Sequence, residues 1–138
     1  MKNLRIICEY EFFNRYSCTY MVFGWRQKKV PNKIRKEINN GENGIVVSIA
    51  SIWELAIKLS LKKIETKINL QEIQAEILKR EFTLLGISFD HLNALSTLSQ
   101  AHGDPFDRLL IAQAIAEGLT IISADRQFKN YHVEVIWQ

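Results

Sequence analysis

Cysteine is scarce in this chain, which has two, Cys8 and Cys18, among 138 residues. Two cysteines are too few for a disulfide framework, and they lack the paired spacing of a structural zinc site. The chain also lacks an apolar run of about 18 residues, the length that a membrane-spanning helix requires. Its first 20 residues contain neither an apolar core of about 7–15 residues nor a small-residue cleavage site, so they do not resemble a secretory signal. These absences favour a cytoplasmic protein with no membrane segment.

The composition is that of a folded domain. Hydrophobic residues make up 47% of the chain and charged residues 24%, which argues against disorder and fits a single domain over residues 1–138. The 18 Lys and Arg residues exceed the 15 Asp and Glu residues, for a net charge of +3. That excess is a mild bias toward anionic partners which many unrelated proteins share.

From residue 33 onward, the sequence alternates between helix and strand patterns. Two helices are predicted at 34–38 and 69–80. Two more are predicted to begin after caps, one at Ser48 or Ser51 and the other at Ser88. A fifth is predicted from Pro105 to a stop at Gly118. Strands are predicted at 45–47, 83–87, 119–122 and 133–137. This alternation predicts an α/β fold of three layers, α/β/α, with a central, mainly parallel sheet.

Acidic residues occupy the positions where functional groups gather in such a fold, beyond the carboxyl ends of the strands. Four acids from three separate elements are candidates: Glu54, Asp104, Asp107 and Asp125. Like charges about 4 Å apart repel by several kcal/mol at an effective dielectric near 20, and a bound divalent cation removes that cost. Oxygen-only ligands favour Mg²⁺ or Mn²⁺ over zinc.

Each acid also has a purely structural interpretation, and both interpretations stay open at this point. Asp104 or Asp107 can stabilise the positive end of a helix by about 0.3–1 kcal/mol. Asp125 can cap the turn at 126–128. Glu54 can be an exposed helix residue, although it lies in an apolar stretch where an isolated carboxylate is costly.

Nearby aromatic and histidine residues receive structural interpretations. Trp53, Phe106 and Phe128 are expected to be core residues, not platforms for stacking nucleic-acid bases. His91 and His132 have no partner at ligand spacing, so the sequence assigns them no role.

Three segments resemble the PIN-domain ribonucleases, specifically the VapC-like toxins of type II toxin–antitoxin systems. They are residues 48–54 (SIASIWE), 102–114 (HGDPFDRLLIAQA) and 122–128 (ISADRQF). The resemblance extends from about residue 30 to the C-terminus. It implies that Glu54, Asp107 and Asp125 hold Mg²⁺ or Mn²⁺, that the Asp104 carboxylate lies close by, and that the Ser123 hydroxyl supports the site.

The resemblance further implies a PIN-like fold and metal-assisted hydrolysis of RNA phosphodiester bonds. Arg108 and Arg126 adjoin the acids and are candidates for holding phosphate oxygens, or equally for surface ion pairs with a neighbouring acid. The implied partners are an antitoxin, whose C-terminal segment covers the acidic cleft, the RNA substrate, and a second copy of the chain in a homodimer.

Residues 1–29 depart from the family pattern, which begins with an apolar strand ending in Asp-Thr-His, followed shortly by Trp. That Asp is the family's first metal ligand, and this sequence has no such motif. A shifted reading frame over residues 12–21 can encode Phe-Leu-Ile-Asp-Thr-His-Val-Leu-Ile-Trp. We hypothesise that two compensating frame changes altered this segment. The gene tests the hypothesis, because it requires the Arg15 codon to end in A and Ser17 to be encoded by TCA.

If the chain is made as written, two interpretations are open. Glu9, which follows the apolar run at residues 4–8, can replace the missing first ligand. Alternatively, the chain is a catalytically impaired PIN domain that binds antitoxin or RNA without cleavage.

Overall fold

The computed structural model describes residues 5–8, 31–62, 69–101, 103–123 and 126–136. Asp125 and most of the atypical segment therefore lie outside the described residues. Within these ranges, five strands form one sheet in the order β3-β2-β1-β4-β5, and every neighbouring pair is parallel. The strands are β1 (Arg5–Cys8), β2 (Gly44–Ser48), β3 (Thr83–Leu85), β4 (Thr120–Ile122) and β5 (Val135–Ile136). The predicted parallel sheet is confirmed.

The helices agree with the sequence pattern. They are α2 (Asn32–Asn39), α3 (Ile49–Ser60), α4 (Leu70–Lys79), α5 (Phe89–Ser96), α6 (Pro105–Glu117) and the 3₁₀ helix η2 (Arg126–Asn130). Ser48 is the N-cap of α3, and its hydroxyl accepts a hydrogen bond from the Ala50 amide at 3.1 Å. Asn69 and Ser88 cap α4 and α5 in reciprocal capping boxes. In the described part of the chain, no helix has the length and hydropathy to cross a membrane.

The central strand of the sheet comes from the atypical N-terminal region. β1 lies between β2 and β4, with Ile6 opposite Ile45 and Ile7 opposite Val46. Both β1 isoleucines are fully buried. Residues 5–8 of the apolar run therefore form a strand, as the Glu9 interpretation assumed, and Glu9 directly follows it in the sequence. The chain adds β2 and β3 on one side of β1 and β4 and β5 on the other, so strand order reverses at β1, where parallel sheets bind their ligands.

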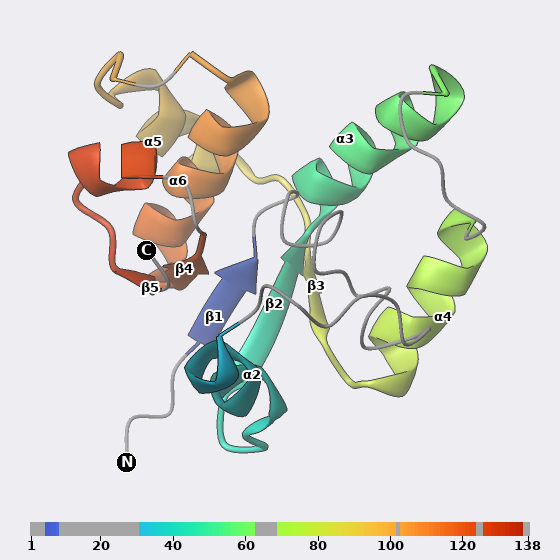
Figure 1. The fold of residues 1–138 in the computed structure, drawn as a ribbon. Helices are drawn as coiled ribbons and strands as arrows, with labels where there is room; N and C mark the ends of the chain where they lie inside the picture. Colours follow the sequence, from blue (N-terminus) through green and yellow to red (C-terminus); the bar gives the residue numbers. More distant parts are fainter. Residues whose placement is uncertain (1–4, 9–30, 63–68, 102, 124–125, 137–138) are drawn as a thin grey trace.

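Each face of the sheet has its own hydrophobic core, which gives the predicted three layers. One core combines the strands with α2 and α4 through residues such as Ile34 and Ile77. The other combines them with α6 and η2 through residues such as Leu110 and Phe128. Figure 1 shows α4 and the α5–α6 pair on opposite sides of the strands. The two cores follow from the strand sequences, because successive side chains point to opposite faces.

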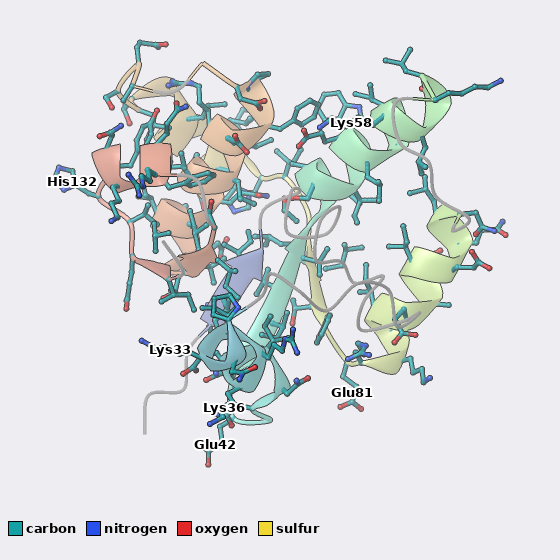
Figure 2. All side chains as sticks on the ribbon, viewed as in Figure 1. Lys33, Lys36, Glu42, Lys58, Glu81 and His132 are labelled. Carbon is teal, nitrogen blue, oxygen red and sulfur yellow. The ribbon has the colours of Figure 1, made fainter. Side chains whose placement is uncertain are left out.

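Helix α4 ends in a Schellman motif with a residue that is poorly suited to it. The Phe82 amide donates to the Ile77 carbonyl and the Glu81 amide to the Leu78 carbonyl, both at 3.0 Å. Glu81 occupies the left-handed position, with φ of 57°, where a Cβ is unfavourable and glycine is preferred. Its side chain points outward from the turn after α4 (Figure 2).

We expect Glu81→Gly to raise the free energy of unfolding by about 0.5–1 kcal/mol, because glycine adopts this conformation without steric strain. Gly118 provides the matched control, since it ends α6 with φ of 65° and no atom lies within 4 Å of an added Cβ. Gly118→Ala should lower stability by a similar amount. Urea unfolding measures both, and a loss of stability in Glu81→Gly would contradict this account of the turn.

Candidate active site

Helices α3 and α6 bring two of the candidate acids to the same edge of the sheet. α3 begins where β2 ends, so it starts at the carboxyl edge. α6 runs antiparallel to the strands, because its last residue, Glu117, lies near the start of β1. The carbonyl of Glu117 accepts a hydrogen bond from Arg5 Nη1 at 3.4 Å. The first turn of α6 therefore lies toward the carboxyl edge, and α6 packs against α3.

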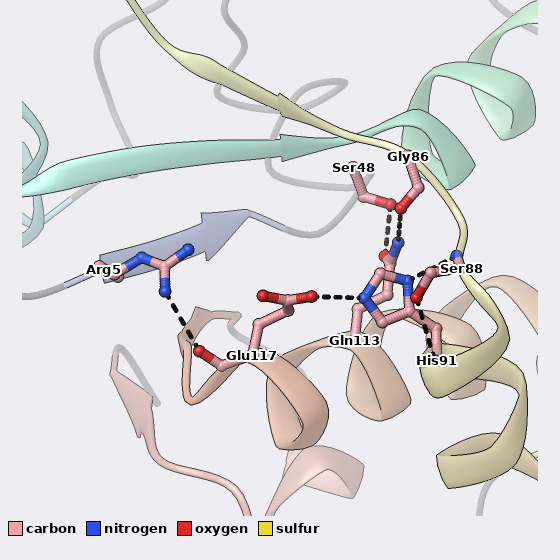
Figure 3. Close-up of polar contacts among 7 residues, drawn as sticks. All are labelled: Arg5, Ser48, Gly86, Ser88, His91, Gln113 and Glu117. Carbon is pink, nitrogen blue, oxygen red and sulfur yellow. Dashed lines mark hydrogen bonds and ion pairs between the residues drawn. The ribbon is translucent and has the colours of Figure 1, made fainter.

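A hydrogen-bond chain that runs through two buried side chains joins these elements at that edge. The Ser48 hydroxyl donates to Gln113 Oε1 at 2.5 Å, and Gln113 Nε2 donates to the Gly86 carbonyl at 3.2 Å (Figure 3). Both side chains are fully buried. Sequence analysis missed Gln113, although it is the one polar residue in the helical run at 109–114. A lone amide in a buried stretch is the signal that points to such a partner.

An aromatic pair holds the two helices together beside the acids. The Trp53 and Phe106 rings meet edge to face, with centroids 5.1 Å apart. Each ring directly precedes an acid in the sequence, Glu54 in one case and Asp107 in the other. The core prediction is confirmed for Phe128, which is fully buried. It is wrong for Trp53, which is 55% exposed although its ring contacts Phe106.

Glu54 is a buried carboxylate, 8% exposed, and so the interpretation of an exposed helix residue is wrong. Lys58 lies one turn further along α3 and places Nζ 2.9 Å from Glu54 Oε1. The Lys58 side chain is more exposed than that of its partner, so the pair lies at the boundary between core and solvent. A buried carboxylate is costly without such compensation.

Asp104 and Asp107 occupy the start of α6. Asp104 is the N-cap, and its Oδ1 accepts hydrogen bonds from the amides of Phe106 at 2.8 Å and Asp107 at 3.1 Å. The structural interpretation is thus confirmed for Asp104, and it does not conflict with a position near a metal. Asp107 is half-buried in the first helical turn.

The candidate supporting residues differ in their surroundings. Ser123 directly follows β4 and is fully buried. Arg108 donates through Nη1 to the Ser99 carbonyl at 2.6 Å and through Nη2 to the Leu98 carbonyl at 3.4 Å, so it fixes the segment between α5 and α6. Arg126 is exposed at the start of η2.

His91, to which the sequence assigned no role, joins α5 to the end of α6. It is almost fully buried, its Nδ1 accepts from the Ser88 amide at 3.0 Å, and its Nε2 lies 2.9 Å from Glu117 Oε1. With Nδ1 accepting, the ring proton lies on Nε2 and points toward Glu117. The separation of 26 residues between the partners explains why spacing did not reveal the pair.

The described residues include two of the carboxylates that the sequence predicts as ligands of a hard divalent cation. Glu54 and Asp107 offer carboxylate oxygens, which suit Mg²⁺ or Mn²⁺. Across the described ranges, no group of three or more His, Cys, Asp or Glu side chains is placed to hold a metal ion. Asp125, the third expected ligand, is outside those ranges.

Comparison with known proteins gives a family match and similar folds. A family model described as PIN domain matches residues 20–134. A VapBC2 structure from Rickettsia felis, bound to a DNA fragment from its promoter, has a TM-score of 0.64 at 19% identity and covers 98% of this chain and 99% of that one. DNA-bound VapBC from Salmonella typhimurium has a TM-score of 0.63 at 14% identity, and FitAcB from Neisseria gonorrhoeae has 0.60 at 14%. Each of these two matches covers 96% of this chain and 96% of the chain in the solved structure. No curated protein matches the chain.

Proposed function

The chain belongs to the PIN-domain family, and from that membership we propose that it is a metal-dependent endoribonuclease toxin of a type II toxin–antitoxin system. The observation that carries the proposal is the packing of α3 against α6, with Trp53 and Phe106 in contact. This packing brings the segments that carry Glu54 and Asp107 together at the carboxyl edge of the sheet. Both acids lie in the family-like motifs.

The proposed ligands are Glu54, Asp107 and Asp125, with Asp104 beside them. A divalent ion supplies Lewis-acid stabilisation of the negative charge that develops on the phosphate. Glu54, buried beside Lys58, would hold one side of that ion. Asp107, in the first turn of α6, would hold another. Ser123, buried directly after β4, would support the ligand two residues further along the chain.

The two arginines contribute differently to this proposal. Arg126 is exposed at the start of η2, directly after Asp125 in the sequence, so its guanidinium is the better candidate for holding a phosphate oxygen of RNA. Arg108 donates to two backbone carbonyls, and we assign it the orientation of the loop that precedes α6.

We propose an antitoxin as the protein partner, with RNA as substrate and a homodimer as the assembly. Two of the similar structures are described as VapBC bound to DNA, which supports the antitoxin partner, whereas the RNA substrate and the homodimer are proposed from the family resemblance. An antitoxin segment that covers the acids would suppress cleavage, so the purified pair should be inactive where the isolated chain is active.

Metal removal tests the activity directly. We expect the full chain to cleave a structured RNA with Mg²⁺ or Mn²⁺ present, to lose cleavage in excess EDTA, and to regain it when Mn²⁺ is restored, because the carboxylates alone stabilise no developing phosphate charge. Gel analysis of end-labelled RNA measures the rate. The chelation cycle in one preparation is the control, since a contaminating metal-independent ribonuclease would survive EDTA. An unchanged cleavage rate in excess EDTA would contradict the proposal.

The second candidate is a PIN domain that binds antitoxin or RNA without cleaving. It is favoured by one specific observation, the absence of the family's Asp-Thr-His motif from the sequence around the central strand. RNA binding by the intact chain with no cleavage at any Mg²⁺ or Mn²⁺ concentration would establish this candidate.

A further inference from the structure

We propose that the buried Ser48–Gln113 hydrogen bond is a positioning device that sets the separation of Glu54 and Asp107. This inference rests on the proposed metal site and goes beyond it, since neither residue is among the acids or bases of that site. Ser48 ends β2 and caps α3, while Gln113 lies on α6. The bond between them is therefore a direct link between the two acid-bearing helices.

The two acids lie equally far from this bond along their helices. Glu54 is six residues from Ser48 along α3, and Asp107 is six residues from Gln113 along α6. At a rise of 1.5 Å per residue, each acid lies about 9 Å along its helix from the level of the bond. Sliding α6 against α3 would change the distance between the carboxylates directly, because both helices are rigid over that length.

The bond restricts the relative position of α3 and α6 more tightly than apolar packing does. Gln113 uses both ends of its amide, with Oε1 on Ser48 and Nε2 on the Gly86 carbonyl. The Ser48 oxygen also accepts from the Ala50 amide, so its position is set by α3 as well. All these side chains are buried, where an unmade hydrogen bond is costly. Sliding of the helices that stretches these donor–acceptor distances beyond about 3.5 Å would break this chain.

A second contact lies close to the level of the acids. The Trp53–Phe106 ring pair joins the same two helices one residue before each acid. Because the two contacts lie at different positions along the helices, they fix both the distance and the crossing angle between α3 and α6. The aromatic pair is partly exposed and non-directional in comparison, so we assign the finer control of spacing to Ser48 and Gln113.

Manganese affinity tests the inference without relying on cleavage. In Gln113→Met, which keeps the volume and removes both hydrogen bonds, we expect the Mn²⁺ dissociation constant of the full chain to rise by about tenfold, as for other residues that orient metal ligands. Ser48→Ala should give a similar rise, and Ser48→Thr, which retains the hydroxyl, should restore most of the affinity. Electron paramagnetic resonance of free Mn²⁺ measures each constant.

A stability control separates positioning from general damage. Ile34→Ala removes a buried side chain from α2 in the core on the other face of the sheet. It should lower the melting temperature yet change the Mn²⁺ constant less than twofold. If it weakens Mn²⁺ binding as much as Gln113→Met, the inference is overturned. Additive losses in the Ser48→Ala and Gln113→Met double variant would also overturn it, since one shared bond can be lost only once.

The outcomes distinguish this inference from the proposed function. Mn²⁺ binding by the wild-type chain without RNA cleavage would refute the nuclease activity, and the variant affinities would still decide the inference. Absence of Mn²⁺ binding by the wild-type chain would overturn both. If Gln113→Met does not fold, Ser48→Ala and Ser48→Thr test the same bond from its other end.

Discussion

Asp107→Asn should reduce metal-dependent RNA cleavage by about 10²- to 10³-fold, the equivalent of about 3–4 kcal/mol of transition-state stabilisation. The substitution keeps the shape of the side chain and removes the charge that would hold the cation. Asp107 lies in the first turn of α6, where a carboxylate stabilises the helix by only about 0.3–1 kcal/mol. The loss of activity should therefore greatly exceed the loss of stability. Single-turnover cleavage rates and urea unfolding measure the two effects.

Asp90 supplies the matched control, because it is an exposed acid in the first turn of the neighbouring helix α5. Asp90→Asn makes the same chemical change, also in a first helical turn, outside the family-like motifs. It should leave cleavage within about twofold of wild type. Equal losses in both variants would point to the net charge of the chain and not to a ligand, and would refute the role of Asp107.

The elements that local chemistry determines could be predicted from the sequence. Pro105 at the start and Gly118 after the end bounded α6 correctly, because each residue favours one helix terminus for a steric reason. Asn69 and Ser88 were likewise correct as caps of α4 and α5. The order of helices and strands then gave the parallel sheet, since alternating elements leave few other ways to bury both faces.

The parts that depend on distant partners could not be predicted. β1 is four residues long, and a short apolar run alone does not distinguish a strand from a buried helical segment. It is a strand because β2 and β4 pair with it on both sides. Gln113 accepts its hydrogen bond from Ser48, which is 65 residues away in the sequence. In the candidate site, the sequence suggested the acids as candidates through motifs, and the Glu54–Lys58 pair follows from i,i+4 spacing on one helix. The burial of Glu54, by contrast, depends on how α3 packs.

The 3₁₀ helix η2, which directly follows the candidate ligand Asp125 in the sequence, is anchored by a large buried side chain. Phe128 is fully buried in the core that contains Ile7 and Leu110. It follows Asp125 by three residues and anchors η2, which has only five residues. A 3₁₀ helix of this length has little stability of its own, so we assign the placement of η2 to the burial of this ring.

Phe128→Ala should lower the free energy of unfolding by about 3–5 kcal/mol, through the lost apolar contacts and the cavity left behind. That is a large share of the roughly 5–15 kcal/mol typical of a whole domain. Phe89→Ala is the control, because Phe89 is 82% exposed at the start of α5 and its removal should change stability by less than about 0.5 kcal/mol. Urea unfolding of both variants measures the difference. Similar values would mean that the Phe128 ring is not held in the core, and that η2 is positioned by its backbone contacts.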